Sequence, residues 1–495
     1  MNATTRQPAA DAHGLDWIDR SICAYLLLPL LLFCLWFTTP VATALLAASV
    51  YGAYRALHGG RARSAGIPAG WLIAIATLSF AWVAIAGVGH FFYANADWVI
   101  RDAVLHDLSI ANWPTTYAGP DDATFILRAP VAYFLPAGAF GQLAGPVAAD
   151  FALYLWTVLG WGLMLAAALR MFNTNAQRTL CLVALVGFGG MDLVGHLWAT
   201  GQAPPIGGHL EWWAQVIQYS SNTTLLFWAP NHALPAWLGT MLILRHWRQP
   251  ALACITPLLA AAIPLWSPLT AIGLFPLFLF GLAWRRDLKQ LLSPHACLPF
   301  LPVALAIALY LGMDAASVRH GWQLEFFPSA SALAYYWVVF CLLEFGLLAL
   351  VLSRLTPLDQ PLRIALVVLC LLPLYSFGPG NDLAMRASIP ALTVLALATV
   401  KPLADKRGTP WHGVLVLVLA IGAFGAVQEP LRTLSRPSWA PNMQTLPRAT
   451  QPDASPVLQF PVHYVAPADP RGIQSLMRRP IPIDVSAQDG IEPAR

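Results

Sequence analysis

The chain has 495 residues, of which 58% are hydrophobic and only 11% are charged. Soluble domains carry about 25% charged residues, so this composition excludes an ordinary water-soluble protein and predicts that lipid is the outer solvent. The net charge of +4 is too small for nucleic-acid binding by bulk electrostatics, so we expect no nucleic-acid partner.

Apolar runs of about 17–25 residues, the length that crosses a bilayer, recur along the chain. They predict an all-α, polytopic transmembrane helical bundle with about thirteen spans. The first two spans and the region at 266–268 could instead be re-entrant hairpins. The expected spans are 21–38, 41–56, 69–89, 147–169, 179–199, 224–244, 251–265, 268–284, 298–313, 333–353, 361–377, 388–402 and 411–427.

The distribution of basic residues predicts the orientation. With the N-terminus inside, 17 of the 28 Lys and Arg residues lie in inner segments and only four lie in outer loops between spans. This bias predicts an inside N-terminus and an outside C-terminus. Lysine is scarce and alanine and leucine are abundant, as in proteins from GC-rich bacterial genomes. We therefore expect a bacterial cytoplasmic (inner) membrane protein whose large loops face the periplasm.

The chain divides into a transmembrane domain and a tail. The expected domain, 1–430, has large outer loops at 90–146, 200–232 and 314–332. The tail, 431–495, is polar and rich in proline, and we expect it to be a weakly ordered outer segment.

Most carboxylates between the first and last spans lie in outer loops or at outer span ends. The inner loops hold only Asp287, Asp359 and Asp405. The chemistry is therefore expected at the outer face.

The start of the first large outer loop carries a candidate general base. If 96–111 is a helix, Asp97 and Arg101 are i,i+4 neighbours, and so are Asp102 and His106. A carboxylate here could take a proton from a substrate near the membrane surface. The alternative is that these pairs only order a juxtamembrane helix.

Two acids fall deeper than the first turn or two of a predicted span, where ionisable groups usually face a cavity or a partner. Asp192, near an outer span end, either lines a polar cavity or pairs with His196. Glu344 lies deeper, with no charged neighbour in sequence, so we expect a structural hydrogen bond or a protonated carboxyl.

The outer segment 200–232 is dense in aromatic, amide and carboxylate side chains. Rings at the membrane surface could form an ordinary aromatic belt. This mixture exceeds what a belt needs and is typical of a sugar-binding cleft.

A short outer turn at 378–388 precedes another span. Arg386 lies near the positive N-terminal end of that span, which suits a phosphate or pyrophosphate. A salt bridge from Asp382 to Arg386 that closes the turn is an equal and compatible alternative.

The sequence requires no cofactor. It has no HExxH motif and no compact His/Cys cluster, so a divalent metal is only weakly indicated and no metal ligand is predicted.

The early acidic outer loop, the many spans and the aromatic-polar outer loops resemble the GT-C superfamily of membrane glycosyltransferases. The strings LEWWAQVIQYSSNTTLLFWAPNHALPAW and GNDLAMRASIPAL look like those of bacterial membrane proteins. The resemblance implies transfer of a sugar from a polyprenyl-phosphate-linked donor, with membrane lipid as a partner and Asp97, or Asp102 in its place, as the catalytic acid. We expect substrate-binding residues at Arg101, Asp192, His209, Glu211, Trp212, Tyr219, Asn222, Asn231, His232, Asp382 and Arg386.

Other functions remain open at this stage. A transporter or flippase of a lipid-linked or polar substrate would need paired bundles and polar groups near the middle of the membrane. A polysaccharide polymerase or ligase would share the outer site. A purely structural membrane subunit would not need so many outer acids, histidines and tryptophans.

Overall fold

The structure is a computed structural model. It describes residues 14–44, 46–47, 51, 66–120, 123–285, 300–378, 380–451, 460–468 and 476–485. Much of the expected second span, 41–56, and the first residues of the ninth, 298–313, lie outside the described residues.

The described chain is mostly helical, with little sheet. Six of its helical stretches are long and apolar enough to cross a membrane. The larger number of spans and the sides on which the termini lie stay predictions. The six stretches are α1 (Trp17–Phe37), α6 (Pro146–Leu169), α7 with α8 (Asn175–Gly187 and Asp192–Thr200), α16 to α17 (Ala330–Cys341 and Leu347–Leu355, joined by the π-helical turn η5, Leu342–Gly346), α19 with α20 (Asp382–Ala387 and Ile389–Asp405) and α21 (Pro410–Ser435).

The remaining elements are shorter. Five of these helices are also apolar: α3 (Ala69–Ile85), α11 (Ala251–Trp266), α12 (Pro268–Arg285), α15 (Leu301–Gly312) and α18 (Gln360–Leu371). The others are α4 (Trp98–Ile110), α5 (Leu135–Ala144), α9 (Asn222–Trp228), α10 (Pro230–His246), α22 (Leu446–Ala449), the 3-10 turns η2 (Glu211–Ala214), η3 (Ala315–Ser317), η4 (Gln323–Phe326) and η6 (Leu372–Leu374), and the strands β1 (Thr116–Ala118), β2 (Thr124–Leu127), β3 (His320–Trp322), β4 (Tyr375–Phe377) and β5 (Val465–Pro467).

Local chemistry sets several helix ends. The side chain of Asp16 accepts the Asp19 N–H while Asp19 caps Asp16 in return, which is a capping box at the start of α1. Helices α11 and α12 are separated at Ser267, whose extended backbone precedes Pro268. Proline at the first helical position starts a helix readily but cannot continue the preceding one. The two helices then pack against each other.

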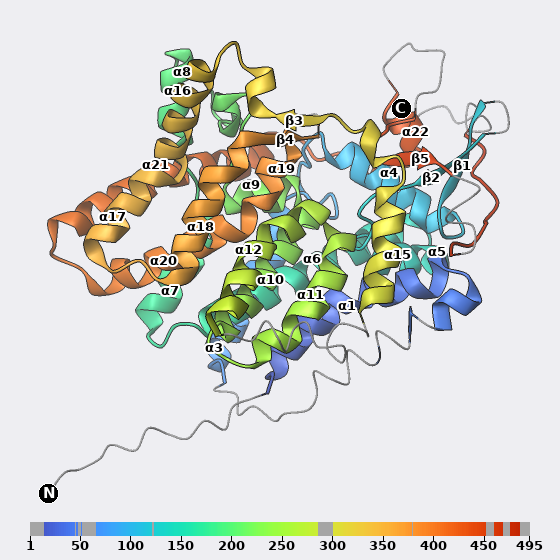
Figure 1. The fold of residues 1–495 in the computed structure, drawn as a ribbon, viewed down its shortest axis with the longest axis horizontal. Coiled ribbons are helices and arrows are strands. Elements are labelled where there is room, and N and C mark those ends of the chain that lie inside the picture. The colour runs from blue at the N-terminus through green and yellow to red at the C-terminus, as the bar shows by residue number, and fades with distance from the viewer. Residues whose placement is uncertain are drawn as a thin grey trace, which may run out of the picture.

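Helices α10 and α20 form the interior of the bundle, and most of their residues are buried. Helix α10 packs against α6, α11, α12 and α20, so it contacts much of the rest of the bundle (Figure 1). Its last turn belongs to an ion-pair cluster in which Arg245 and His246 bind Asp16 and Asp19 at the start of α1. This cluster fixes the end of the bundle that lies away from the large loops.

Short strands and α4 gather at the loop-rich end, from the upper middle to the upper right of Figure 1. One sheet has the order β1-β2-β5 and the other pairs β3 with β4, all antiparallel. Strand β5 comes from the C-terminal tail, and Met477 and Ile483 form further bridges with Thr38 and Tyr117. The expectation of a weakly ordered tail is therefore wrong for these described residues. Apolar side chains that are far apart in the sequence, such as Val465 and Met477, are buried in the fold although the tail is polar on average.

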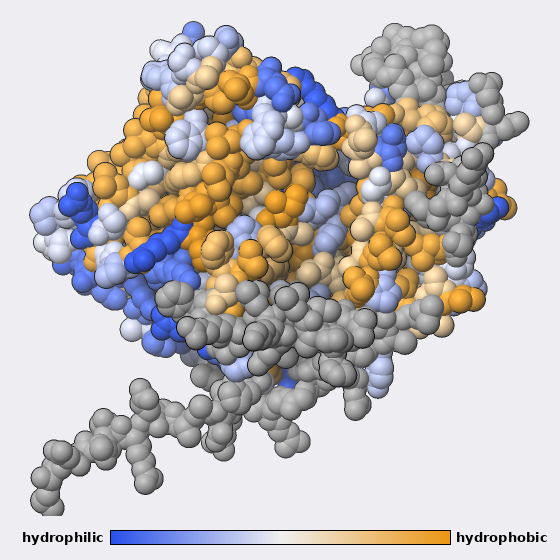
Figure 2. Space-filling view, in the orientation of Figure 1, coloured by the Kyte–Doolittle hydropathy of each residue, from blue (hydrophilic) through white to orange (hydrophobic). Residues whose placement is uncertain are grey.

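The surface shows how the bundle meets its surroundings. Apolar side chains cover much of the face in Figure 2, while hydrophilic residues gather at the lower left, over the ends of α17 and α20, and along the upper edge. An apolar band between two polar rims is the pattern of a membrane protein.

Candidate functional site

Helix α4 is held in place by two bonds to a single carbonyl of α9. Asn95 Nδ2 and Trp98 Nε1 donate to the backbone oxygen of Phe227 at 2.7 and 3.0 Å. Asn95 Oδ1 in turn accepts the N–H of Asp97 at 3.0 Å. The position of Asp97 is thus set by buried neighbours.

The expected pairing of Asp97 with Arg101 is confirmed. Asp97 Oδ2 lies 3.3 Å from Arg101 Nη2, and the Asp97 side chain is 47% exposed whereas that of Arg101 is 10% exposed. Asp97 is therefore a carboxylate that is held from one side by a buried guanidinium and is open to a molecule on the other.

The expected pairing of Asp102 with His106 is wrong. Asp102 Oδ2 lies 3.1 Å from His90 Nε2, whereas His106 contacts Asp107 at 3.2 Å. The loop after α3 brings His90 over α4, a contact that helical spacing cannot reveal. Asp102 is also buried, so of the two candidate bases only Asp97 is accessible.

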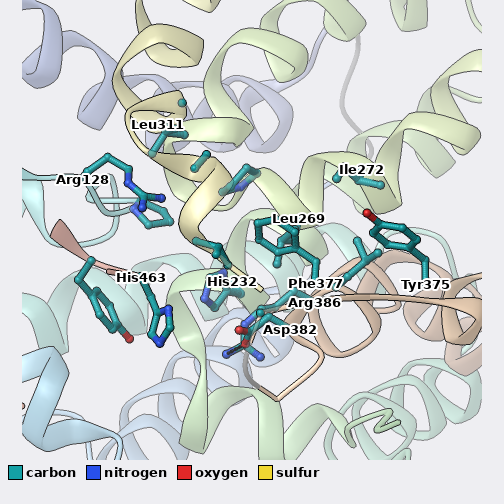
Figure 3. Close-up of a pocket in the computed structure, with 18 residues that line it drawn as sticks. Arg128, His232, Leu269, Ile272, Leu311, Tyr375, Phe377, Asp382, Arg386 and His463 are labelled. Carbon is teal, nitrogen blue, oxygen red and sulfur yellow. Dashed lines mark ion pairs between the residues drawn. The ribbon is translucent and has the colours of Figure 1, made fainter. Parts of the chain in front are cut away.

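A cavity of about 460 Å³ lies at the loop-rich end, next to the start of α10, α12 and α19 (Figure 3). One part of its wall is apolar, with Leu269, Ile272 and Leu311. The other part is polar and basic. It consists of Arg128, His232, Tyr375, Asp382, Arg386, His463 and Tyr464. A molecule with both an apolar chain and an anionic head fits such a wall.

The first turn of α10 and the short helix α19 supply the centre of the polar wall. His232, in the first turn of α10, places Nδ1 2.8 Å from the Ser267 hydroxyl at the break between α11 and α12. Arg386 in α19 binds Asp382 at 3.0 Å, so the expected salt bridge is confirmed. The turn before α19 is capped by Asn381, which adopts a left-handed backbone (φ 53°) and accepts the N–H of Ala384.

The third basic group enters from the loop between α4 and α5. Arg128 follows β2, and its Nη2 donates to the carbonyl of Val462 at 2.6 Å. This bond, together with the β2–β5 pairing, brings His463 and Tyr464 of the tail to the cavity wall. Burial lowers the pKa of Arg128, opposed by the charge of Asp314. Desolvated guanidinium groups gain most from an anionic partner.

Tyr464 links α4 to this cavity. Burial raises the pKa of Tyr464, the positive charges of Arg101 and Arg386 lower it, and the negative charges of Asp97 and Asp382 raise it. The two Asp–Arg pairs therefore lie within electrostatic reach of one cavity-lining side chain. His232 also lies within electrostatic reach of both Arg101 and Arg386.

A second acidic cluster lies away from the cavity. Asp192 is fully buried and faces Glu344, not His196, and neither lines the cavity. Glu344 accepts the indole N–H of Trp213 at 2.9 Å, so the expected structural hydrogen bond is present. Glu344 has no charged neighbour in sequence, but the fold brings Asp192 to it from a distant helix. Glu344 lies in the π-helical turn η5, a feature that often occurs at functional sites.

Glu211 and His209 belong to networks of their own. Glu211 accepts from Gln218 at 3.0 Å and from the backbone N–H of Ser221 at 2.9 Å. His209 Nδ1 lies 3.3 Å from Glu429, which also binds Arg432 at 2.9 Å. The Glu211 bonds brace the loop at 207–221 from within, and the His209–Glu429 contact ties that loop to the end of α21.

Four further residues of the predicted cleft do not line the cavity. Tyr219 donates to the carbonyl of Leu369 at 2.6 Å, and Asn222 accepts from a buried indole at 3.3 Å. Trp212 is 63% exposed. Asn231 is buried beside His232, but its side chain does not line the cavity. The structure thus gathers His232, Asp382 and Arg386 at the cavity, with Asp97 and Arg101 within electrostatic reach of residues that line it.

Sequence reasoning missed Arg128, Tyr375, His463 and Tyr464. Arg128 carried a signal, because it is one of four basic residues in the outer loops. His463 and Tyr464 lie in the tail that we expected to be weakly ordered. Comparisons with protein-family models, with curated proteins and with solved structures found no match to this chain.

Proposed function

We propose that the chain is a membrane-embedded glycosyltransferase of GT-C type, which transfers a sugar from a polyprenyl-phosphate donor at the periplasmic face of the bacterial inner membrane. The observation that carries the proposal is the two-sided cavity. Its apolar wall suits the prenyl chain, and Arg128 and Arg386 suit the phosphate.

The reaction follows from this placement. The acceptor hydroxyl attacks the anomeric carbon of the donor, forming a new carbon–oxygen bond as the bond to the phosphate oxygen breaks. The electron pair leaves with the polyprenyl phosphate, whose charge Arg386 and Arg128 stabilise. The acceptor proton passes to the Asp97 carboxylate, which Arg101 holds in position.

The test uses the purified full chain in lipid nanodiscs. It compares binding of radiolabelled decaprenyl phosphate, and transfer from a panel of decaprenyl-phosphate hexoses and pentoses, in the wild type and in Arg386→Gln and Arg128→Gln variants. Loss of a charge-assisted bond should weaken binding roughly 10–100-fold. Arg319→Gln is the matched control, because Arg319 stacks on Phe326 and does not line the cavity. Equal binding by all four proteins would contradict the proposal.

A transporter or flippase is the second candidate, and the buried pair of Asp192 and Glu344 favours it. Intramembrane acids that face each other are typical of proton-coupled carriers. One experiment distinguishes the two proposals: it asks whether the donor is cleaved and whether Asp192 or Asp97 is required. A carrier needs Asp192 and moves substrate without cleaving it, whereas a transferase cleaves the donor and needs Asp97. A polymerase or ligase would use the same cavity, and repeating the transfer assay with different acceptors distinguishes it.

A further inference from the structure

Three side chains that do not line the cavity converge at α4. They are His90 in the loop after α3, Asp102 in α4 and Asp150 near the start of α6. One ligand atom from each lies within 4.8 Å of the other two. The side chains of His90 and Asp102 are 4% and 3% exposed, and Asp150 is 7% exposed. The convergence is thus buried and joins three segments.

Asp150 is the unusual member. Its Oδ1 is buried and has no hydrogen-bond partner in the part of the chain that the structure describes. A buried carboxylate without a partner is costly, so such a group takes up a proton, pairs with a cation or coordinates a metal ion. The charged groups nearest to it are His90 and the second acid, Asp102.

The orientation of His90 adds an independent constraint. Its Nδ1 lies 2.9 Å from the backbone carbonyl oxygen of Trp439, which can only accept, so Nδ1 carries a hydrogen. Nε2 therefore faces the carboxylates either with a second proton or with a free lone pair. A histidine whose outer nitrogen is fixed by a carbonyl is the usual arrangement of a metal ligand.

We propose that His90, Asp102 and Asp150 hold a divalent transition-metal ion, with Zn²⁺ or Mn²⁺ as the class of ligand. One imidazole and two carboxylates suit these ions better than Ca²⁺ or Mg²⁺, which prefer oxygen ligands alone. Two ligand atoms about 2.1 Å from a tetrahedral zinc ion lie about 3.4 Å apart, so the observed spacing needs only small movements. Asp102 Oδ2 also accepts the N–H of Asn442 at 2.9 Å, as ligating carboxylates commonly do.

The site would join α4, α6, the loop after α3 and the segment around Trp439. Because Asp97 directly precedes α4, the ion would hold that helix and the start of it in position without touching a substrate. The inference does not rest on the transferase reaction, and its test needs no substrate.

The first experiment measures metal in the wild-type protein, purified as the full chain in detergent. Metal content is determined by mass spectrometry. The chain is then stripped with a chelator, and Zn²⁺, Mn²⁺, Mg²⁺ or Ca²⁺ is added singly during thermal unfolding. We expect about one Zn²⁺ or Mn²⁺ per chain, and a rise in Tm of roughly 3–5 °C on reloading. No retained metal together with no rise in Tm would overturn the proposal.

The second experiment distinguishes a metal ion bound at these three residues from a second proton on His90. If His90 is simply an imidazolium paired with Asp102, Asp150 is a surplus buried charge, and Asp150→Asn should melt at the same or a higher temperature. If the ion is present, Asp150→Asn should bind Zn²⁺ roughly 10–100-fold more weakly and lose the metal-dependent rise in Tm. The matched control is His106→Gln, because His106 lies on α4, as Asp102 does, but contacts a single acid, Asp107.

Discussion

Gly273 of α12 provides a way to move Arg386 without altering any charged group. A Cβ added at Gly273 would lie 2.8 Å from the carbonyl carbon of Ala387 and 2.9 Å from its Cα, and closer still to the carbonyl oxygen. Ordinary contact begins at 3.4 Å, and these are backbone atoms that no rotamer change can remove. Gly273→Ala must therefore push α19 away from α12.

The size of the effect follows from that displacement. Relieving the overlap requires a movement of about 1 Å, and Ala387 is adjacent to Arg386. A misplacement of about 1 Å can reduce turnover roughly 100-fold. The overpacking itself should cost about 1–3 kcal/mol of unfolding free energy.

The assay compares transfer from the decaprenyl-phosphate donor with thermal unfolding of the same preparations. Gly413→Ala is the control, because the added Cβ at that helical position meets no atom within 4 Å. That variant should keep full activity and gain up to about 1 kcal/mol in stability. If Gly273→Ala folds and turns over donor like the wild type, the placing of the phosphate at α19 is refuted.

Three further predictions test separate parts of the structure. Asp97→Asn should bind decaprenyl phosphate normally but lose transfer by at least about 100-fold; weakened binding with unchanged turnover would contradict a proton-accepting role. Asp192→Asn should leave thermal stability unchanged or raise it, because it removes one of two facing buried carboxyl groups; a large loss would show that Asp192 has a cationic partner. Burial by itself lowers the pKa of His209, but its bond to Glu429 and the nearby carboxylate charges outweigh burial and raise that pKa. The contribution of His209 to the stability of the folded chain should thus be complete below its unfolded pKa of about 6.5, and should be lost as pH rises through the higher folded pKa. Melting curves from pH 6 to 9 should show this slope in the wild type but not in His209→Gln, and equal slopes would contradict it.

Local features of the fold were predictable from sequence. The helix expected at 96–111 is α4, and both i,i+4 ion pairs that involve an arginine are present, at Asp97 and at Asp382. Such contacts depend only on helical spacing, which the sequence contains directly.

Contacts between distant segments were not predictable in this way. His90 meets Asp102 across a loop, and Asp192 meets Glu344 across about 150 residues, so no spacing rule relates them. The role of the tail was hidden for a different reason. Its few apolar residues are too widely spaced to form a run, and they are buried by contacts with distant segments, where β5 pairs with β2, α22 packs on α4 and Met477 bridges Thr38.

The most direct test of the central claim is photo-crosslinking with a decaprenyl phosphate that carries a benzophenone on the isoprene unit next to its phosphate, using the full chain in nanodiscs. Adducts mapped by mass spectrometry should fall at 268–272, 311–318 and 375–386, and excess unlabelled decaprenyl phosphate should abolish them. Adducts concentrated around Asp192 and Glu344, or labelling that unlabelled lipid does not displace, would contradict the account.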